Sequence, residues 1–297
     1  MKKVIITGGT GFLGRSLAKH LSEHYYEVVT IGRTDPGADF PFRFVTWNGF
    51  ERGGWEQELT GAHAIVNLAG KTVDCIKTPD NCDLILRSRV DSTKVIGEAL
   101  KAVEDPPKIW IQMSTAHIYG DPPSRICDED SHTGYGLAPF VGSAWEKAFK
   151  EAIPEHCRGV IMRTSFVIGR NGGALASLKR IVNLGLGGKV GSGTQGMSWL
   201  HELDFNRFVQ NAIENESYKG VYVLSSPNPV SNRKFMKLLR RTLKMPLGLS
   251  APEFVTRYGA KYLFKTDPEL ALYGRYVVSR RLEMEGFEFS FPDLEDA

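Results

Sequence analysis

Residues 2–14 of the chain read KKVIITGGTGFLG, a short apolar and β-branched run that leads into four glycines. A run of this kind, ended by glycine, is typical of a buried strand. The pattern GRSLAKHLSEH (14–24) that follows is helical, and EVVTI (27–31) predicts a second strand. Strand, glycine-rich turn, helix and strand in this order predict the opening unit of a parallel sheet.

The same alternation continues along the chain. Apolar runs at 62–70, 108–114 and 159–165 predict three further strands, and helical patterns at 83–103 and 143–153 lie between them. Strands that alternate with helices build a parallel sheet covered on both faces. We therefore predict an α/β fold, a Rossmann-type doubly wound parallel sheet with a smaller C-terminal region.

Composition narrows the class of protein. The 297 residues carry a formal net charge of +3 without a basic block, which predicts neither a nucleic-acid nor a membrane partner. The four cysteines show no C-x-x-C pair and no histidine at metal spacing, so we expect no metal site and a reduced, cytoplasmic protein. The glycines interrupt the N-terminal apolar run, and no run approaches the ~20 residues of a membrane span, so we expect neither a signal peptide nor a spanning helix.

The glycine-rich turn satisfies both G-x-G-x-x-G and G-x-x-G-x-x-G. One glycine permits the tight turn, another lets the backbone approach a pyrophosphate, and the last lets helix and strand pack closely. The helix that begins here points unpaired N–H groups and its positive end at the phosphates. A strand before the turn and a helix after it favour a dinucleotide site over a purely structural turn. The residues predicted to bind the dinucleotide here are Gly8, Gly11, Phe12, Leu13 and Gly14.

The end of the second strand indicates which dinucleotide binds. An NAD site normally has an acid there for the ribose 2′-hydroxyl, but the sequence reads Ile-Gly-Arg-Thr, with no acid until Asp35. Arg33 can neutralise a 2′-phosphate, and Arg15 can assist it. Either arginine could instead be a solvated surface residue. We predict NADP(H) as the cofactor.

The glycine-rich stretch GLGGKVGSGTQG (185–196) marks a change of character in the chain. We predict a dinucleotide-binding core over residues 1–170 and a substrate-side region with a C-terminal extension over 171–297, from which some segments return to the core. Ligands of open parallel sheets bind at the carboxyl ends of the strands, so the second region should complete a cleft there. The glycines suit a lid that orders on binding, or a plain surface loop.

Several longer motifs carry a resemblance. They are ITGGTGFLGRSL, AIVNLAG, SRVDST, MRTSFVIGRNGGAL, GLGGKVGSGTQGMSWLH, SPNPVSN and GFEFSFPDLEDA, which together run almost from end to end. On these motifs the chain resembles the extended short-chain dehydrogenase/reductase superfamily, and within it the atypical NAD-dependent epimerase/dehydratase-like subgroup. The resemblance implies a Rossmann domain followed by a C-terminal domain of unknown function.

The resemblance also implies further cofactor contacts. The run Asn67 to Gly70 would line the adenine and ribose side, and Arg89 would lie beneath the cofactor. Lys71 departs from the subgroup, which usually has an acid at this position. At the nicotinamide end, backbone groups of the residues after the strand at 159–165 would make contact. The cofactor-binding residues implied in this way are Leu68, Ala69, Gly70, Arg89, Thr164, Ser165 and Phe166.

Superfamily chemistry uses a serine or threonine, a tyrosine and a lysine four residues after the tyrosine. Counting back from the Tyr-Gly pair selects Thr115 as the hydroxyl, whereas the subgroup pattern also fits Ser114, and both remain candidate catalytic residues. Alignment on Glu146 puts Ala138 at the tyrosine position and Gly142 at the lysine position. Neither can move a proton, and a positioned acid or base is worth about 10²–10⁴ in rate.

Other side chains could replace the missing pair. Tyr135 would serve if the loop before the helix bent inward, and His117 and His201 titrate near neutral pH, although structural roles are favoured for both. Tyr119 is expected to pack, Asp204 to cap a helix and Trp199 to border the substrate.

The sequence leaves two functions open. One is an NADP(H)-dependent oxidoreductase or epimerase-like enzyme that acts on a small carbonyl or sugar-nucleotide substrate. The other is a non-catalytic NADP(H)-binding sensor or regulatory protein, which the absent Tyr-x-x-x-Lys pair favours. Both need a small-molecule ligand, and both leave a homodimer possible.

Overall fold

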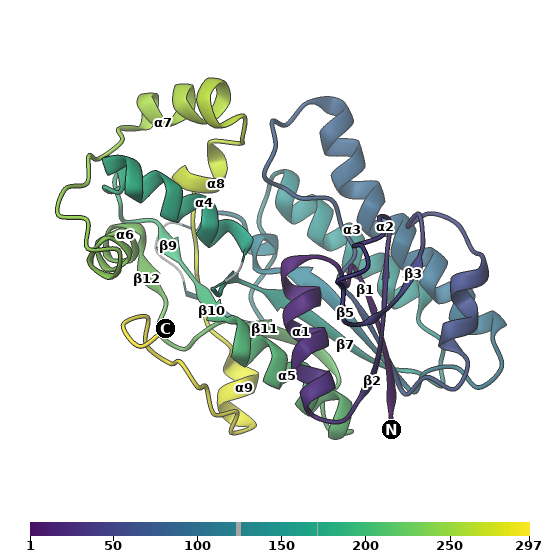
Figure 1. Ribbon diagram of the computed structural model, residues 1–297. Coiled ribbons are helices and arrows are strands. Elements are labelled where there is room, and N and C mark those ends of the chain that lie inside the picture. The colour runs from purple at the N-terminus through teal and green to yellow at the C-terminus, as the bar shows by residue number, and fades with distance from the viewer. Residues whose placement is uncertain (123–125, 171) are drawn as a thin grey trace.

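The N-terminal glycine stretch folds as predicted in a computed structural model that describes residues 1–122, 126–170 and 172–297. Strand β1 (Lys3–Thr7) is almost wholly buried and leads through the glycine turn into α1 (Phe12–Glu23). The helix returns the chain to β2 (Glu27–Gly32), which pairs with β1 in parallel. Figure 1 shows this unit beside the centre of the molecule.

Seven strands form the central sheet, and every pair of neighbours is parallel. In spatial order they are β11 (Gly220–Leu224), β7 (Arg158–Thr164), β5 (Ile109–Thr115), β4 (Ala64–Asn67), β1, β2 and β3 (Arg43–Thr46). The order reverses between β1 and β4. This is the doubly wound α/β sheet that the sequence predicted, and its switch point lies beside the glycine turn.

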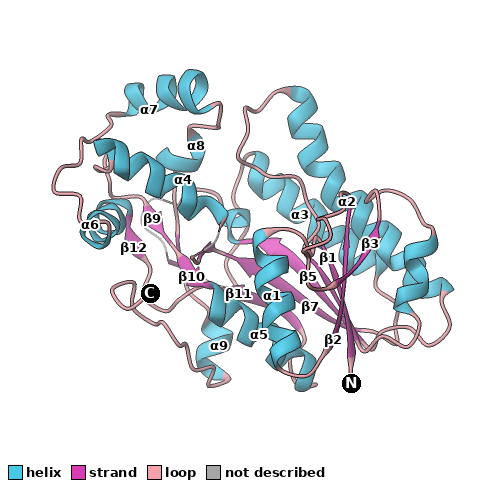
Figure 2. Ribbon diagram, viewed as in Figure 1, coloured by secondary structure: helices cyan, strands magenta, loops and turns pink. Residues whose placement is uncertain are grey.

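Helices cover both faces of the sheet (Figure 2). On one face α1 packs with α5 (Glu202–Glu214) over a core that includes Leu17, Phe205 and Phe208. On the other face lie α2 (Pro79–Ala102), α3 (Leu137–Ala152) and the short helix η1 (Gly54–Leu59). Trp110 and Phe149 pack edge to face in that second core.

The C-terminal region is a smaller body at the carboxyl edge of the sheet, at the left of Figure 1. Its own core contains Val182, Phe235 and Met236. Trp199 is fully buried in this core, so the expectation that it borders the substrate is wrong. Its helices are α4 (Gly173–Ile181), η3 (Val182–Leu186), α6 (Asn232–Thr242), α7 (Glu253–Gly259), η4 (Ala260–Phe264), α8 (Glu269–Leu272) and α9 (Arg280–Met284).

Three short strand pairs involve this region, and the first and the last of them join it to the core. They are β8 (Phe166–Ile168) with β10 (Trp199–His201), β9 (Gly196–Met197) with β12 (Val230–Ser231), and β6 (Ile126–Cys127) with β13 (Tyr276–Val277). The single turn η2 (Ala116–Tyr119) lies between β5 and β6. Among the helices of the described residues, none combines the length and apolarity that a bilayer crossing requires.

Candidate functional site

The glycine turn is as tight as its chemistry predicted. Gly8 has a φ of +71°, and a Cβ there would lie 2.8 Å from the carbonyl oxygen of Leu68. A Cβ on Gly14 would lie 2.5 Å from the carbonyl oxygen of Gly8. Helix α1 begins after Gly11, which caps it without a side-chain hydrogen bond. Its first N–H groups therefore remain available to an anionic ligand.

A cavity of about 230 Å³ opens beside this turn. Its lining residues are Gly8, Thr10, Gly11, Ile31, Gly32, Arg33, Trp47, Asn48, Gly49, Phe50, Leu68, Ala69, Gly70, Lys71, Ser88 and Ser92. The charged members are Arg33 and Lys71, and this lining contains no carboxylate. A site with two cations and no acid suits a ligand of high negative charge.

One wall of the cavity was not predicted. Trp47 and Asn48 follow β3, a strand that the sequence analysis missed. The Oδ1 of Asn48 accepts hydrogen bonds from the backbone N–H of Phe50 at 2.9 Å and of Glu51 at 3.0 Å, which fixes the turn. The signal was present, because an Asn-Gly pair directly after a run of aromatic and β-branched residues marks the end of a strand.

In the predicted Asn67 to Gly70 run, the first residue is structural and the other three line the cavity. Asn67 is fully buried, and its Oδ1 accepts from the N–H of Ala69 at 3.1 Å and the hydroxyl of Thr7 at 2.6 Å. The three residues after it line the cavity. Asn67 thus shapes the turn that presents Leu68, Ala69 and Gly70.

Other predicted residues surround the cavity without lining it. The exposed Arg15 donates from Nε to the carbonyl oxygen of Thr10 at 2.8 Å, and its guanidinium lies 4.8 Å from the ring centroid of Phe40. Leu13 packs against the core under α1. The ring of Phe12 occupies the space that a Cβ on Gly172 would need, 2.9 Å away. Phe12 thus joins the turn to the start of the C-terminal region.

Arg89 lies at the edge of the cavity. Its Cζ would be 3.2 Å from a Cβ on Gly70, and it lies 5.1 Å from the ring centroid of Trp145. Its Nη1 donates to the carbonyl oxygen of Ile85 at 3.0 Å. Burial lowers the pKa of Arg89 to about 10, and no described carboxylate forms an ion pair with it. The guanidinium is therefore a charged donor that can serve a bound anion.

Strand β5 presents the two candidate hydroxyls to opposite faces of the sheet. Ser114 is 2% exposed, and its hydroxyl donates to Oε1 of the buried Glu146 at 2.8 Å. Thr115 is half-buried, and its oxygen accepts from the N–H of His117 at 3.1 Å. Within the described residues the Thr115 hydroxyl donates to no acceptor. Only Thr115 therefore has a proton available to a substrate oxygen.

Glu146 belongs to a buried polar network. Arg163 donates to it from Nε at 2.8 Å and from Nη2 at 2.9 Å, and a third nitrogen donates to the Tyr119 hydroxyl at 2.9 Å. Burial raises the pKa of Tyr119 to about 12. Tyr119 is thus a neutral packing residue, as expected, and Ser114 completes the same network.

Thr164, which ends β7, and the two residues after it make different side-chain contacts. The hydroxyl of Thr164 donates to the sulfur of Met113 at 3.1 Å, and that of Ser165 donates to the carbonyl oxygen of Leu224 at 2.8 Å. Phe166 packs edge to face on Phe235 in the C-terminal core. Their side chains are engaged, so a contact with a nicotinamide would use backbone groups.

The residues at the positions of the missing tyrosine and lysine have surroundings that do not suit those side chains. A Cβ on Gly142 would lie 3.2 Å from Ile118, which fills the space that a lysine would need. Ala138 lies in the first turn of α3. Tyr135 is 98% exposed, and Lys147 pairs with Glu151 at 3.8 Å on the surface. None of these side chains restores the pair in this structure.

The surroundings of His117, His201 and Asp204 indicate structural roles for all three. Burial, together with Arg275 and Lys77, lowers the pKa of His117 to about 3, so the imidazole is neutral. His201 caps α5, because its Nδ1 accepts from the N–H of Leu203 at 3.1 Å. The prediction that Asp204 caps this helix is therefore wrong. Its carboxylate instead accepts from two N–H groups of the C-terminal segment, those of Ser290 and Phe291.

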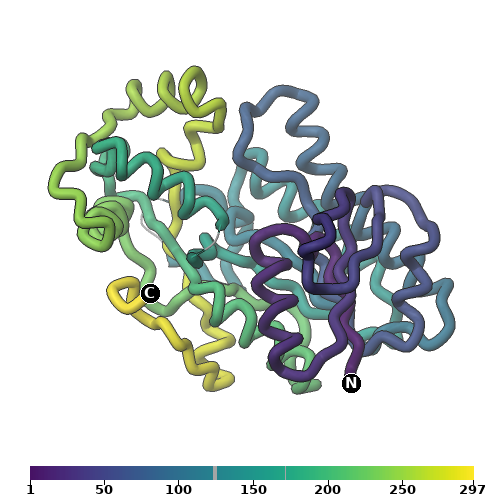
Figure 3. The backbone as a smooth tube through the Cα atoms, in the orientation of Figure 1, coloured from purple at the N-terminus to yellow at the C-terminus, as the bar shows by residue number. Residues whose placement is uncertain are grey.

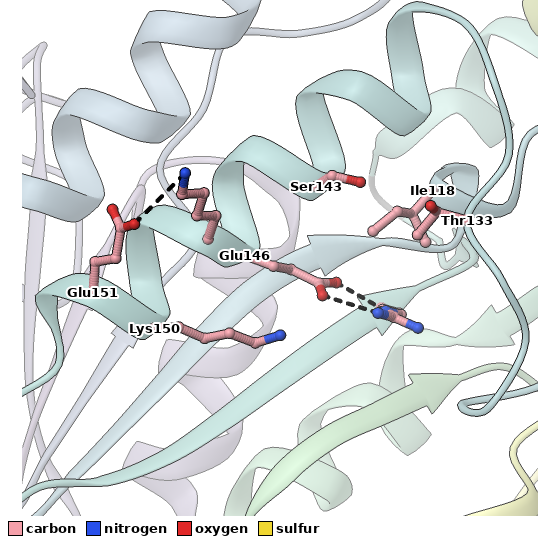
Figure 4. Close-up of a pocket in the computed structure, with 8 residues that line it drawn as sticks. Ile118, Thr133, Ser143, Glu146, Lys150 and Glu151 are labelled. Atoms are coloured by element: carbon pink, nitrogen blue, oxygen red, sulfur yellow. Dashed lines mark hydrogen bonds and ion pairs between the residues drawn. The ribbon is translucent and has the colours of Figure 1, made fainter.

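A second hollow, of about 430 Å³, lies along α3 (Figure 4). The Glu146–Arg163 pair forms its inner wall, and Ser143, Lys150 and Glu151 lie along its outer wall. It shares no lining residue with the cavity beside the glycine turn. Nor do the described residues hold a group of three or more side chains placed to bind a metal ion.

Comparisons with known proteins show which family the chain matches. A sequence model of the NAD dependent epimerase/dehydratase family matches residues 4–225, and one of a domain of unknown function matches 251–297. The chain is 31% identical to Epimerase family protein SDR39U1 of Mus musculus, over 99% of this chain and 98% of that protein. It is 30% identical to the chloroplastic SDR39U1 homolog of Arabidopsis thaliana, over 99% of this chain and 85% of that protein.

Solved structures of similar proteins superpose on this chain. Human epimerase family protein SDR39U1 (isoform 2), crystallised with NADPH, superposes with a TM-score of 0.88 at 28% identity, over 99% of this chain and 97% of that one. A nucleoside-diphosphate sugar epimerase from Corynebacterium glutamicum superposes with a TM-score of 0.79 at 28% identity, over 99% and 57%. Bordetella bronchiseptica WbmG with NAD has a TM-score of 0.76 over 99% and 90%, and at 18% identity it shows the fold alone.

Proposed function

Since the chain belongs to the NAD dependent epimerase/dehydratase family, as its motifs predicted, we propose that it binds NADP(H) beside the glycine turn. We further propose that it acts as an oxidoreductase or epimerase-like enzyme on a small carbonyl or sugar-nucleotide substrate. The name of the Corynebacterium glutamicum neighbour, a nucleoside-diphosphate sugar epimerase, supports the second substrate class.

The charges in the cavity lining support NADP(H) as the cofactor. Arg33 and Lys71 are its charged residues, and no carboxylate in that lining would repel a 2′-phosphate. The glycine turn is a cradle that a Cβ at Gly8 or Gly14 would fill, so the backbone fits a pyrophosphate. The human relative was solved with NADPH, which supports the same choice.

The residues of this chain then have distinct tasks. The α1 N-terminus and Arg89 would neutralise the phosphates, and Arg33 would hold the 2′-phosphate. When bound, the nicotinamide supplies or accepts a hydride. Thr115 would donate a hydrogen bond to the reacting oxygen of the substrate, because its hydroxyl proton has no acceptor among the described residues.

A titration calorimetry experiment tests the cofactor. The wild-type protein should bind NADPH more tightly than NADH. Arg33→Ala should weaken NADPH binding about 10- to 100-fold, the value of a charged hydrogen bond, and leave NADH binding unchanged. Arg87→Ala is the matched control, because Arg87 is an exposed arginine on α2 that lies outside the cavity. Equal affinities for the two cofactors in the wild type would overturn the proposal of NADP(H).

A non-catalytic NADP(H) sensor is the second candidate, and the position of Gly142 against Ile118 favours it. The two candidates differ in turnover. For an enzyme, cofactor fluorescence changes with a competent substrate, and Thr115→Val suppresses the change. A sensor keeps its affinity for NADPH in Thr115→Val and turns over no substrate in either form.

A further inference from the structure

Residues 240–265, here called the 240–265 segment, are unlike the rest of the chain. They contain six lysines and arginines and one acid, Glu253, whereas the whole chain has 37 basic and 34 acidic residues. They are also rich in exposed apolar side chains, which number eight. These are Leu247, Leu249, Phe254, Val255, Tyr258, Tyr262, Leu263 and Phe264. Exposed apolar side chains gathered in one place mark an interaction surface.

The apolar side chains form an ordered stripe on α7 and η4. Phe254, Tyr258 and Tyr262 are spaced four residues apart, which puts them on one side of the helix. They are 66%, 67% and 68% exposed. The rings of Tyr258 and Tyr262 stack, with centroids 6.1 Å apart. Ala260 is buried and stands two residues from each tyrosine, on the opposite side of the helix, so the stripe is the outer side.

Cations flank this stripe. Lys261 places its Nζ 5.4 Å from the ring centroid of Tyr262, and Lys244 and Lys265 are exposed. Of the six cations only Arg257 forms an ion pair with a described carboxylate, that of Glu253. In Figures 1 and 3 the segment occupies the upper left corner, on the opposite side of the molecule from β3. None of its residues lines the cavity beside the glycine turn.

We propose that the 240–265 segment docks this protein onto the surface of a membrane that contains anionic phospholipids. A helix with exposed aromatic and aliphatic side chains and flanking lysines lies in the plane of a bilayer surface. The segment begins before and then enters the C-terminal domain of unknown function, residues 251–297, and would give that domain a role.

Charge and chemistry decide against the other occupants. Six cations less one anion leave +5 on the segment, which would repel the same face of a second copy. Nucleic acid binds aromatic rings by stacking, but the leucines and valine of the segment have no such partner there. Apolar lipid chains and acidic headgroups match both properties at once.

Vesicle sedimentation with the full chain tests the proposal. The protein should sediment with vesicles of phosphatidylcholine and phosphatidylglycerol, and not with phosphatidylcholine alone. High salt should weaken the binding, because it screens the lysines. No binding to the anionic vesicles, or equal binding to both kinds, overturns the proposal.

Two double variants separate charge from apolar contact. Lys261→Glu with Lys265→Glu should weaken binding to anionic vesicles by about fivefold or more for each charge. Phe254→Ser with Tyr262→Ser should weaken it at least about tenfold. Phe140→Ser is the matched control, because Phe140 is 61% exposed but lies on α3.

Unchanged thermal unfolding and NADPH affinity would show that each variant is folded. Two further results would contradict membrane docking. One is a concentration-dependent dimer that the Phe254→Ser, Tyr262→Ser variant abolishes. The other is binding to single-stranded DNA that exceeds binding to the anionic vesicles.

Discussion

At the scale of single residues, the two hydroxyls at the end of β5 have opposite tasks. Ser114 faces α3 and donates to Glu146, while Thr115 faces the other side of the sheet with its proton free of described acceptors. Glu146 in turn holds Arg163 through two hydrogen bonds, with side chains 4% and 10% exposed. A buried carboxylate and guanidinium tolerate each other only as a pair.

Removing the carboxylate should therefore be costly. Glu146→Ala leaves a buried guanidinium uncompensated and should destabilise the protein by about 3–5 kcal/mol in urea unfolding. Ser114→Ala removes one hydrogen bond and should cost about 1 kcal/mol. The control is Glu151→Ala, which breaks only an exposed pair with Lys147. If the Glu146 variant unfolds at the same urea concentration as this control, the network is not a structural anchor.

His117 predicts a pH dependence. Its folded pKa of about 3 lies below the unfolded value of about 6.5. The unfolded chain therefore binds the proton more readily, and the stability that the neutral imidazole gives is present above about pH 6.5 and lost as the pH falls toward 3. Between pH 7.5 and 5, wild-type protein should lose about 1–2 kcal/mol relative to His117→Gln. Denaturant unfolding of both proteins across this range measures the difference, and parallel curves would refute it.

At the scale of elements, glycines set how closely helices approach. A Cβ on Gly97 of α2 would lie 2.5 Å from the Cβ and 2.6 Å from the carbonyl oxygen of Ala152 on α3. Both helices must separate to accept it. Gly259, at the end of α7, has helical backbone angles and no neighbouring atom within 4 Å of such a Cβ.

The same substitution should then have opposite effects at these two positions. Gly97→Ala should destabilise the protein by about 1–3 kcal/mol through overpacking. Gly259→Ala should stabilise it by about 0.4–1 kcal/mol, because it restricts only the unfolded chain. Thermal unfolding of the two variants measures both. A stabilising Gly97→Ala would mean that α2 and α3 are packed less closely than described.

At the scale of the whole molecule, one carboxylate joins three distant segments. The Oε1 of Glu129 accepts from the N–H of Val223 at 2.9 Å and the hydroxyl of Ser279 at 2.6 Å, and its Oε2 accepts from the N–H of Arg280 at 3.0 Å. The loop after β6, the edge strand β11 and the start of α9 therefore meet at this side chain. It fastens the C-terminal region to the sheet.

Glu129→Ala should loosen that attachment. The Val223 and Ser279 donors are buried, and each one left without an acceptor costs about 1–3 kcal/mol, so α9 and the residues after it should become accessible to protease while the sheet stays intact. Limited proteolysis followed by mass spectrometry would locate the cuts. Asp130→Ala is the neighbouring control, since Asp130 is exposed and makes only a long contact with Arg280. Identical digestion patterns for the two variants would exclude this role of Glu129.

The net charge of the whole chain does not reveal the local excess of cations in the 240–265 segment. A net charge of +3 predicted no membrane partner, because it averages the 240–265 segment with the rest. The structure adds that the apolar residues of this segment are exposed. The docking proposal departs from that expectation, because a bilayer meets a local surface and not the average charge, and the vesicle experiment decides between the two.

Features that depend on residues close along the chain could be predicted before the fold was known. The glycine turn, the alternation of strands and helices, and the family motifs all lie within short windows, because backbone turns and helix faces are set by neighbours a few residues apart. For the same reason Gly8, Gly11, Arg33 and the Leu68 to Gly70 run were found in the cavity lining.

Features that join residues distant along the chain could be found only in the folded molecule. From the sequence, Ser114 and Thr115 are equally good candidates for the catalytic hydroxyl. In the folded protein Glu146 lies next to Ser114 and accepts its hydrogen bond, which leaves Thr115 as the candidate. The Trp47 to Phe50 wall, the filling of the lysine position by Ile118 and the burial of Trp199 likewise depend on packing across the sheet. Such contacts follow from how elements pack together, and no local pattern in the sequence encodes that packing.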